Sequence, residues 1–368
     1  MFKDTISRRN FMSGLAAAGA AATAGSAANE IPPTDAVIVT PFPIYESKPA
    51  SGPINIVCAE KLTPAEVEQI RSASPNINLV VVNDRSELKQ KAKAAEVILG
   101  IIDAETVANA GKLQWVQTWH AGVETLPREL MEHPCVLTNM QRVFAPVIAE
   151  TAIALMLSLT RGLAQSSIPS FKQRKWSREE FPLEDLYGKT LGVVGLGGIG
   201  METARRVHYG FSMRVLAVDP KPLPKPEYVA ELHEPAWLMQ MVPQADILMS
   251  AAPLTKETRK MFNEALFRKM KPTALFINVS RGGLVDQEAL AAALKQGWIR
   301  GAGLDVATPE PLPQDHFLWD CPNLAITPHN SGYAPIRQVR LIALVTENVR
   351  RYALGLPLLN VVDKARGY

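Results

Sequence analysis

The feature that most constrains the fold is a glycine-rich motif in the second half of the chain. An apolar run, Leu191–Gly195, leads into a G-x-G-x-x-G pattern, and a helical pattern follows it to about Tyr209. The first glycine of such a motif permits a tight turn, the second lets the backbone approach a pyrophosphate, and the third allows close packing of helix on strand. The flanking strand and helix are the context in which this pattern binds a dinucleotide, through free N–H groups at the helix N-terminus. The residues expected at this phosphate site are Gly195, Gly197, Gly198, Ile199 and Gly200.

An acidic residue ends the next expected strand. Asp219 follows the run Arg214–Val218, at the spacing of about 20 residues where a carboxylate binds the ribose hydroxyls of adenosine. Such a carboxylate would repel a 2′-phosphate, which favours NAD over NADP, although Lys221 nearby weakens that preference. A structural glycine turn without nucleotide is the alternative, and the strand, helix and acid together argue against it.

Short apolar runs alternate with helical patterns through both halves of the chain. This alternation favours parallel pairing, so the expected fold class is α/β with doubly wound parallel sheets. At the first expected helix, Thr63, Pro64 and Glu66 form a capping box with proline at the first helical position. The other elements expected in the first half are helices Glu87–Ala94 and Ala104–Ala110 and strands Ile54–Ala59, Ile77–Val82, Val97–Ile101, Trp115–Trp119 and Val136–Thr138. Those expected later are strands Ile247–Ser250, Leu275–Val279, Gly303–Val306 and Leu324–Thr327 and a long helix at about Pro335–Leu354.

One further helix, Ala145–Arg161, is apolar nearly all round. A helix of this kind is usually buried. Its place between the two strand–helix series predicts that it lies at a domain junction or at a subunit interface.

The bulk composition sets the class of protein. A chain of 368 residues suggests about two domains. The formal net charge of +3 is too small and dispersed to indicate a nucleic-acid partner. None of the three cysteines lies in a CxxC or metal-ligand spacing, so no metal is expected. Three unpaired thiols are favoured, with a Cys58–Cys135 disulfide as the alternative left open.

The first residues have the pattern of an export signal. The pair Arg8-Arg9 precedes an uncharged stretch, Phe11–Ala28, which is rich in alanine and glycine and ends in small residues. The paired arginines resemble the twin-arginine signal, although Ser13 stands where that pattern often has lysine. We therefore expect periplasmic export, with only a transient membrane contact through the signal. A disordered basic tail or an uncleaved membrane anchor is the alternative, and a cytoplasmic location is expected if the motif is not a signal. Residues 29–53 hold six prolines and are expected to form an extended tether, apart from a short strand at Ala36–Thr40.

Three later segments identify a family. They are Asn278–Gly283, Gly303–Leu312 with Glu310 between two prolines, and Thr327–Gly332 with His329. With the glycine motif before them, they make the chain similar to the D-isomer-specific 2-hydroxyacid dehydrogenases from about Ile54 to the C-terminus. The resemblance implies an NAD-dependent oxidoreductase that transfers hydride between the cofactor and a small 2-keto or 2-hydroxy acid.

The chemistry of that reaction accounts for three residue types. A cation must hold the substrate carboxylate and polarise the keto oxygen, which the planar donors of arginine can do. An acid must protonate the oxygen as hydride reaches the carbon, and imidazolium suits this near neutral pH. A carboxylate beside the imidazole favours its charged form and fixes its orientation. The resemblance assigns these roles to Arg281, His329 and Glu310, in that order.

Further roles follow from the resemblance alone. It implies that backbone donors of Ala121 and Gly122 bind the substrate carboxylate, with Ala121 standing where the family often has valine. The implied contacts of the cofactor are Asp305 and the Val279 carbonyl at the nicotinamide, and Pro253 and Thr255 at the adenosine. The residues suggested to line the pocket are Trp115, Trp119, His120 and Tyr333, with core packing the favoured role for at least one tryptophan.

The resemblance also implies a domain organisation. A Rossmann NAD-binding domain, residues 145–332, is expected as an insertion in a discontinuous flavodoxin-like substrate domain, residues 54–144 plus 333–368, with hinge closure over the substrate. A homodimer is expected. Two other functions are compatible with the same fold: a nucleotide-binding sensor or corepressor-like module, and an enzyme acting on formate or phosphite. A pure binding module needs no acid–base pair, which argues against the first. The pairing of a glutamate with the histidine favours 2-hydroxy acids over formate.

Overall fold

The computed structural model describes residues 52–176 and 182–368. The expected export signal at residues 1–28, the strand at 36–40 and nearly all of the tether at 29–53 lie outside these residues. The expectations for the remaining chain can be compared with the structure element by element.

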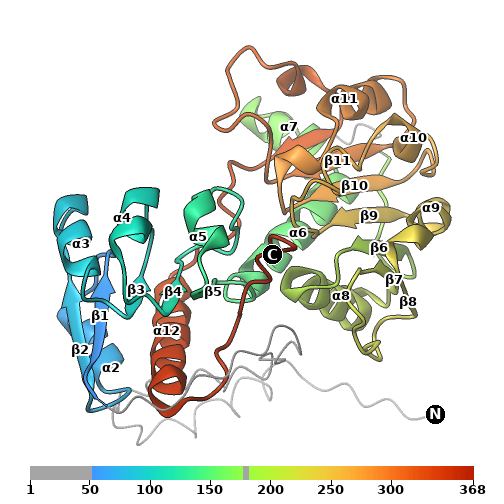
Figure 1. Cartoon of the computed structure of the whole chain (residues 1–368). Coiled ribbons are helices and arrows are strands. Elements are labelled where there is room, and N and C mark those ends of the chain that lie inside the picture. Colours follow the sequence, from blue (N-terminus) through green and yellow to red (C-terminus); the bar gives the residue numbers. More distant parts are fainter. Residues whose placement is uncertain (1–51, 177–181) are drawn as a thin grey trace, which may run out of the picture. The chain divides into compact units, whose positions relative to one another are not determined.

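The first half builds a parallel five-stranded sheet in the order β2-β1-β3-β4-β5 (Figure 1). Its strands are β1 (Ile54–Cys58), β2 (Ile77–Val81), β3 (Val97–Leu99), β4 (Trp115–Gln117) and β5 (Val136–Thr138). The helices between them are α2 (Pro64–Arg71), α3 (Arg85–Ala92), α4 (Ala104–Asn109) and α5 (Arg128–Glu132). The predicted capping box is present at α2, where Glu66 N donates to Thr63 Oγ1 and Thr63 N to Glu66 Oε2 at 2.7 Å. This strand order is that of doubly wound flavodoxin-like sheets.

The second half builds a parallel seven-stranded sheet in the order β12-β11-β10-β9-β6-β7-β8. Its strands are β6 (Thr190–Val194), β7 (Arg214–Val218), β8 (Glu231–His233), β9 (Ile247–Ser250), β10 (Leu275–Asn278), β11 (Gly301–Leu304) and β12 (Leu324–Ile326). The connecting helices and turns are α8 (Gly198–Phe211), η2 (Pro235–Trp237), α9 (Leu238–Met241), η3 (Val242–Gln244), α10 (Glu264–Phe267), η4 (Gly282–Leu284), α11 (Gln287–Lys295) and η5 (Phe317–Asp320). The order reverses at β6, so the edge beside its carboxyl end is the topological switch point where such sheets bind ligands.

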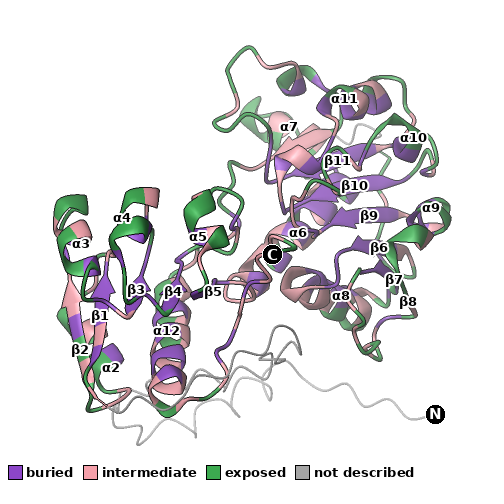
Figure 2. Cartoon of the chain, viewed as in Figure 1, coloured by how far each residue is buried: buried purple, intermediate pink, exposed green. Residues whose placement is uncertain are grey.

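Helix α6 (Ala145–Thr160) packs against strands of the second sheet. It packs against α8, β10, β11 and β12. Ala149, Ala152, Leu155 and Met156 are buried on this face, whereas Ala154 is exposed. Much of the apolar surface that suggested a subunit interface is therefore already covered within the chain. Figure 2 shows the resulting burial of the strands around it.

The C-terminal helix α12 (Arg337–Leu354) returns to the first sheet. It packs against α2, and the Tyr352 ring stacks on Trp115 with centroids 5.6 Å apart. Buried Asn348 donates through Nδ2 to Gln117 Oε1 at 3.0 Å. An antiparallel bridge then joins Val361 to Thr138 at the end of β5. These contacts tie residues 337–362 to the first sheet.

Some expected elements differ from the structure. The strand predicted at Gly303–Val306 is β11, Gly301–Leu304; its Gly-rich sequence has little β-propensity, and a Cβ at Gly303 would stand 2.9 Å from Leu155 of α6. Strand β8 was missed because Glu231–His233 is short and polar. The prediction of three unpaired thiols is confirmed, since all three cysteines are buried and form no disulfide.

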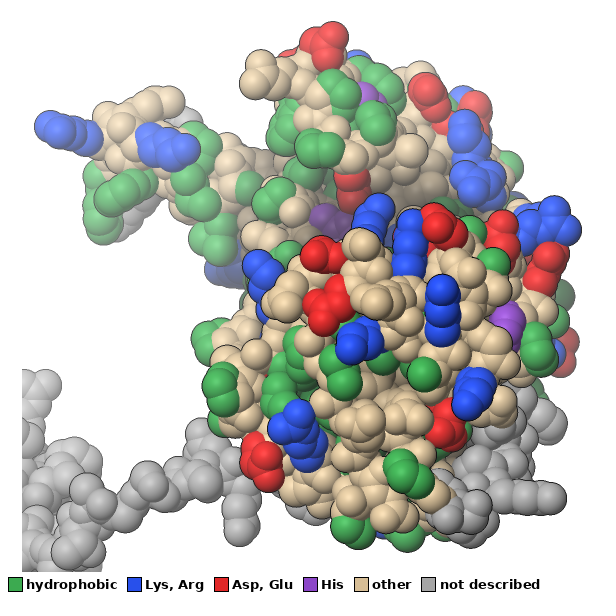
Figure 3. Space-filling view, turned by 60° about the vertical axis from the view of Figure 1, so that its left-hand side comes forward, with side chains coloured by type: hydrophobic (Ala, Val, Ile, Leu, Met, Phe, Trp, Pro, Cys, Tyr) green, Lys and Arg blue, Asp and Glu red, His purple; other side chains and the backbone are tan. Residues whose placement is uncertain are grey.

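The surface of the described residues is mixed in character. On the face drawn in Figure 3, basic and acidic side chains are interspersed. Large apolar side chains are exposed around η1 (Leu163–Ser167) and α7 (Ile168–Lys172), where Phe171 is 83% and Trp176 is 94% exposed. Within the described chain, no single helix is long and apolar enough to cross a membrane, although α6 together with Leu163–Lys172, bent by 61°, passes on length and composition.

Candidate active site

A cavity of about 630 Å³ opens beside the carboxyl ends of the second sheet's strands. This volume is in the range of small-molecule and cofactor sites. The predicted residues that line it are Ala121, Gly122, Gly195, Gly197, Gly198, Ile199, Asp219, Pro253, Thr255 and Arg281. The predicted residues outside the lining are Gly200, Val279, Asp305, Glu310 and His329. The glycine loop, Asp219 and Arg281 therefore line the same cavity.

The glycine loop has the geometry its sequence predicts. Gly195 has φ +94°, and a Cβ there would lie 2.8 Å from the Ala251 backbone. A Cβ on Gly200 would overlap the Gly195 carbonyl oxygen, whereas one on Gly197 would meet no atom within 4 Å. Gly195 and Gly200 thus serve the turn and the packing of α8 on β6, and Gly197 leaves open room for a phosphate. The N-terminus of α8, at Gly198 and Ile199, faces the cavity, so these residues fit a dinucleotide.

Asp219 lies directly beside this loop. Its Oδ2 accepts a hydrogen bond from Leu196 N and its Oδ1 one from Lys221 N, both at 2.8 Å. Burial raises the pKa of Asp219, and the two backbone donors act in the opposite direction. The acid therefore braces the glycine loop while it faces the cavity.

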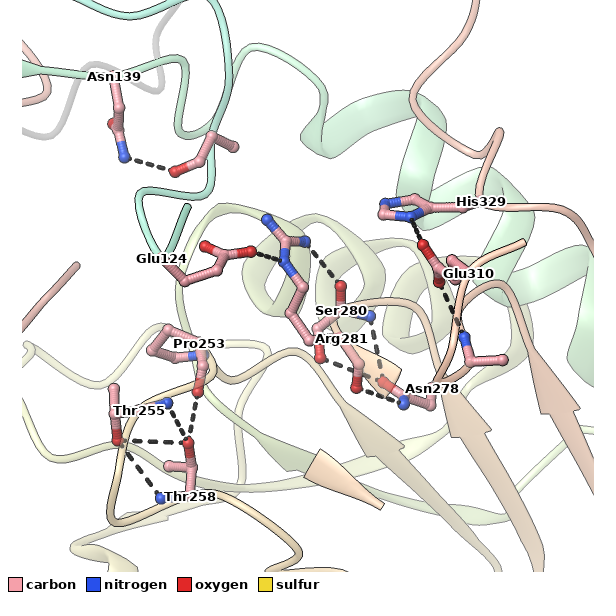
Figure 4. A network of polar contacts seen from close by, with 12 residues as sticks. Glu124, Asn139, Pro253, Thr255, Thr258, Asn278, Ser280, Arg281, Glu310 and His329 are labelled. Carbon is pink, nitrogen blue, oxygen red and sulfur yellow. Dashed lines mark hydrogen bonds and ion pairs between the residues drawn. The ribbon is translucent and has the colours of Figure 1, made fainter. Parts of the chain in front are cut away.

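Arg281 is fixed by the turn that follows β10. Asn278 Nδ2 donates to the Arg281 carbonyl at 2.9 Å, and Asn278 Oδ1 accepts from Ser280 N at 3.2 Å. The guanidinium forms an ion pair through Nε with Glu124 and donates through Nη1 to the Ser280 carbonyl at 2.7 Å (Figure 4). This pairing holds the cation at the cavity wall.

The loop after β4 meets the same guanidinium. A Cβ on Gly122 would overlap Arg281 Nη2 and approach the Glu124 carboxylate, so the backbone of this loop lies directly against the ion pair. Asn139 Nδ2 donates to the Ala121 carbonyl at 2.6 Å and fixes the loop (Figure 4). Burial acts to raise the pKa of Glu124, but the Arg281 guanidinium outweighs it and holds that pKa below its ordinary value.

The histidine and its carboxylate are brought together as predicted. His329 Nδ1 and Glu310 Oε2 lie 2.7 Å apart, and Glu310 Oε1 accepts from Ala307 N at 2.9 Å. Because Nδ1 is engaged by the carboxylate, Nε2 is the ring nitrogen that can meet a substrate. In the view of Figure 4, Arg281 lies between Glu124 and this pair.

Asp305 holds the loop that carries the histidine. His329 has φ +50°, a conformation that non-glycine residues adopt only where the surroundings enforce it. The Asp305 carbonyl accepts from His329 N at 2.7 Å, and its carboxylate accepts from Thr327 Oγ1 at 2.6 Å and from the Ser331 hydroxyl. The contact of Asp305 with nicotinamide stays a prediction, whereas its contacts in the structure position His329.

The other predicted residues lie either in a braced loop of the cavity wall or outside the cavity lining. Thr258 Oγ1 donates to the Pro253 carbonyl at 2.7 Å and accepts from Thr255 N at 2.8 Å, so this cavity loop is braced. Trp115 and Trp119 are buried in the hydrophobic core between the first sheet and α12, so both have the core-packing role that was expected for at least one of them. The four residues suggested for the pocket, Trp115, Trp119, His120 and Tyr333, lie outside the lining. Within residues 52–176 and 182–368, no group of three or more His, Cys, Asp or Glu is placed to hold a metal.

Sequence reasoning gave no role to several residues of the site. Glu124 lies two residues after Gly122, and its place in this recognisable segment was the signal that could have indicated a role. Asn139 and Asn278 act through hydrogen bonds that no local pattern shows. The C-terminal residues Ala365–Tyr368 also line the cavity, and nothing in their sequence indicates it.

Comparison with known proteins identifies the family. The model of the D-isomer specific 2-hydroxyacid dehydrogenase NAD-binding domain matches residues 153–331. Glyoxylate reductase of Korarchaeum cryptofilum is 35% identical over 269 residues, 72% of this chain and 80% of that one. D-3-phosphoglycerate dehydrogenase of Bacillus subtilis is 33% identical over 306 residues, 80% of this chain and 58% of that one. The structure of a D-isomer specific 2-hydroxyacid dehydrogenase from Xanthobacter autotrophicus with NADPH and MES matches with a TM-score of 0.73 at 26% identity, over 87% of this chain and all of that one. With the glycine loop, Arg281 and the His329–Glu310 pair in place, these matches show that the chain belongs to the D-isomer-specific 2-hydroxyacid dehydrogenase family.

Proposed function

We propose that this dehydrogenase reduces a small 2-keto acid of the glyoxylate or hydroxypyruvate class to the D-2-hydroxy acid. The observation that carries the proposal is the His329–Glu310 pair at 2.7 Å, combined with Arg281 at the wall of a cavity that also holds the glycine loop. A module that only bound nucleotide would have no use for a proton donor held in this way. Glyoxylate reductases among the similar proteins support a small substrate.

The geometry of the residues supports the following proposed roles. A nicotinamide cofactor, when bound beside the glycine loop, would supply hydride to the keto carbon. Arg281 and the backbone of Ala121 and Gly122 hold the substrate carboxylate, and the guanidinium polarises the keto oxygen. Nε2 of His329 donates the proton to that oxygen, while Glu310 holds the ring through Nδ1.

The proposed cofactor is NAD. Asp219 faces the cavity at the position that binds ribose hydroxyls, and its carboxylate disfavours a 2′-phosphate. The similar structure from Xanthobacter autotrophicus holds NADPH, and Lys221 adjoins the acid, so both nucleotides belong in the assay. A lower KM for NADPH than for NADH would reverse this assignment.

The test is the oxidation of NADH by the purified chain with a panel of 2-keto acids. We expect His329→Ala to lower kcat by about 10²- to 10⁴-fold, the usual contribution of a general acid. His233→Ala is a matched control, because that imidazole is similarly exposed (44% against 46%) and lies 3.3 Å from Glu231; it should keep full kcat. Nucleotide binding without turnover on any acid would refute the proposal and favour a sensor.

Two further proposals concern assembly and location. We infer that the enzyme forms a homodimer, supported by the exposed apolar side chains around α7. We also infer export to the periplasm, supported by Arg8-Arg9 and the uncharged stretch after them. Recovery of the intact N-terminus exclusively in the cytoplasm of the native host would contradict export.

A further inference from the structure

The last four residues of the chain reach the cofactor cavity. Ala365, Arg366, Gly367 and Tyr368 line it together with the glycine loop and Asp219. Figure 1 shows the chain leaving the foot of α12 and ending at the marked C-terminus. The terminal segment therefore belongs to the wall of the proposed dinucleotide site.

The segment before these residues is anchored on the first sheet. Val362 N donates to the Leu137 carbonyl at 2.8 Å. Lys364 Nζ donates to the carbonyls of Leu130 at 2.9 Å, His133 at 2.6 Å and Cys135 at 2.7 Å. An ammonium group with three carbonyl acceptors fixes the point from which the terminal residues leave.

The terminal residues then fold back on themselves. Gly367 N donates to the Asp363 carbonyl at 2.8 Å, and Asp363 N to the Tyr368 carbonyl at 3.2 Å. Arg366 N donates to Asp363 Oδ1 at 3.1 Å. These hydrogen bonds close a turn over residues 363–368.

The Tyr368 ring lies at the ribose-binding end of the cavity. Lys221 Nζ is 4.6 Å from the centre of this ring, and Lys221 N donates to Asp219 Oδ1. A cation over an aromatic face is a favourable contact. Partial burial raises the pKa of Tyr368. The ring is thus placed beside the acid that binds ribose.

We propose that the C-terminal residues 365–368 form part of the adenosine-binding site, with the Tyr368 ring packing against the adenosine half of the dinucleotide. The inference rests on the proposed nucleotide-dependent function. The cavity keeps about 630 Å³ with the terminal residues in place, so they line the site and do not fill it. Aromatic rings stack on nucleobases of any sequence, which suits this role.

The experiment titrates the full chain and its Tyr368→Ala variant with 5′-AMP, nicotinamide mononucleotide and NADH. We expect Tyr368→Ala to weaken 5′-AMP and NADH by at least about fivefold, the low end for loss of one stacked ring. Affinity for nicotinamide mononucleotide should not change, because that half binds away from the ring. Tyr368→Phe keeps the ring and should bind as the parent does.

Two controls separate binding from folding. A chain that ends at Lys364 lacks the terminal residues but keeps their anchor, and it should show the same loss for 5′-AMP. Tyr187→Ala removes an exposed tyrosine outside the cavity lining and should change no affinity. The unfolding midpoint without nucleotide should be the same for Tyr368→Ala and the parent.

Each outcome decides the inference. Unchanged 5′-AMP affinity in both tail variants overturns it while leaving the dehydrogenase proposal intact. Tighter binding by the variants also overturns it, since the residues would then compete with the nucleotide. A parent chain that binds neither NADH nor NADPH removes this inference together with the proposed function.

Discussion

At the scale of single residues, the site is held by charge pairs formed across long stretches of sequence. The contact of Glu310 with His329 and the place of Arg281 at the cavity wall could be predicted, because each residue stands in a recognisable motif. The Glu124–Arg281 pair could not, since it joins residues 157 positions apart and depends on which loops the two sheets bring together. Gly122 could likewise be read as a motif residue, but its closeness to the Arg281 guanidinium required the structure.

The Glu124–Arg281 pair makes a prediction about pH. Arg281 holds the pKa of Glu124 below its ordinary 4.5 in the folded chain, so the pair stabilises the fold above the unfolded pKa and loses that contribution as pH falls through the lowered value. We expect Glu124→Gln to cost about 1 kcal/mol near pH 7, a value that allows for partial exposure, and less near pH 3. Urea unfolding at both pH values measures this. Glu132→Gln, which breaks the exposed Arg128–Glu132 pair, is the control and should have little effect at either pH. An equal cost for Glu124→Gln at both pH values would contradict the assignment.

At the scale of elements, local signals predicted most strands and helices within about two residues of their observed ends. The Thr63 capping box and the strand–glycine–helix unit carry their own physical reasons, so they could be read from sequence. The bounds of β11 and the existence of β8 could not be read in this way. The first segment is Gly-rich and the second is short and polar, so both lack an intrinsic preference for strand and are fixed by the elements packed beside them.

The β6–α8 unit allows a comparison of two glycines on one helix. A Cβ at Gly200 would overlap the Gly195 carbonyl oxygen, so Gly200→Ala should destabilise the fold by about 1–3 kcal/mol, the usual cost of overpacking. Gly210 lies on the same helix with no atom within 4 Å of a Cβ, so Gly210→Ala should stabilise it by about 0.5–1 kcal/mol. Chemical denaturation of both variants supplies the free energies. The same sign for both changes would show that packing of α8 on β6 does not set the need for Gly200.

At the scale of the whole molecule, the two parallel sheets followed from alternation of strands and helices, and the return of α12 from family resemblance. The position of the C-terminal residues in the cavity followed from neither. It depends on Lys364 finding three carbonyls at the end of the first sheet, a contact between residues more than 200 positions apart. Long-range contacts of this kind form only in the folded chain, so no local sequence pattern predicts them.

The proposed homodimer provides the last prediction. The buried face of helix α6 packs against other elements of the same chain. Phe171 and Trp176, on the segment after it, are almost fully exposed. Large apolar side chains gathered on a surface usually mark an interface. We therefore expect Phe171→Glu to convert a dimer to a monomer in light scattering coupled to size exclusion, since a carboxylate buried there would lack a partner. Val339→Glu places the same charge on an exposed apolar position of α12 and should leave the dimer intact. A parent chain that is monomeric at all concentrations, or a Phe171→Glu variant that remains dimeric, would place the interface elsewhere or remove it.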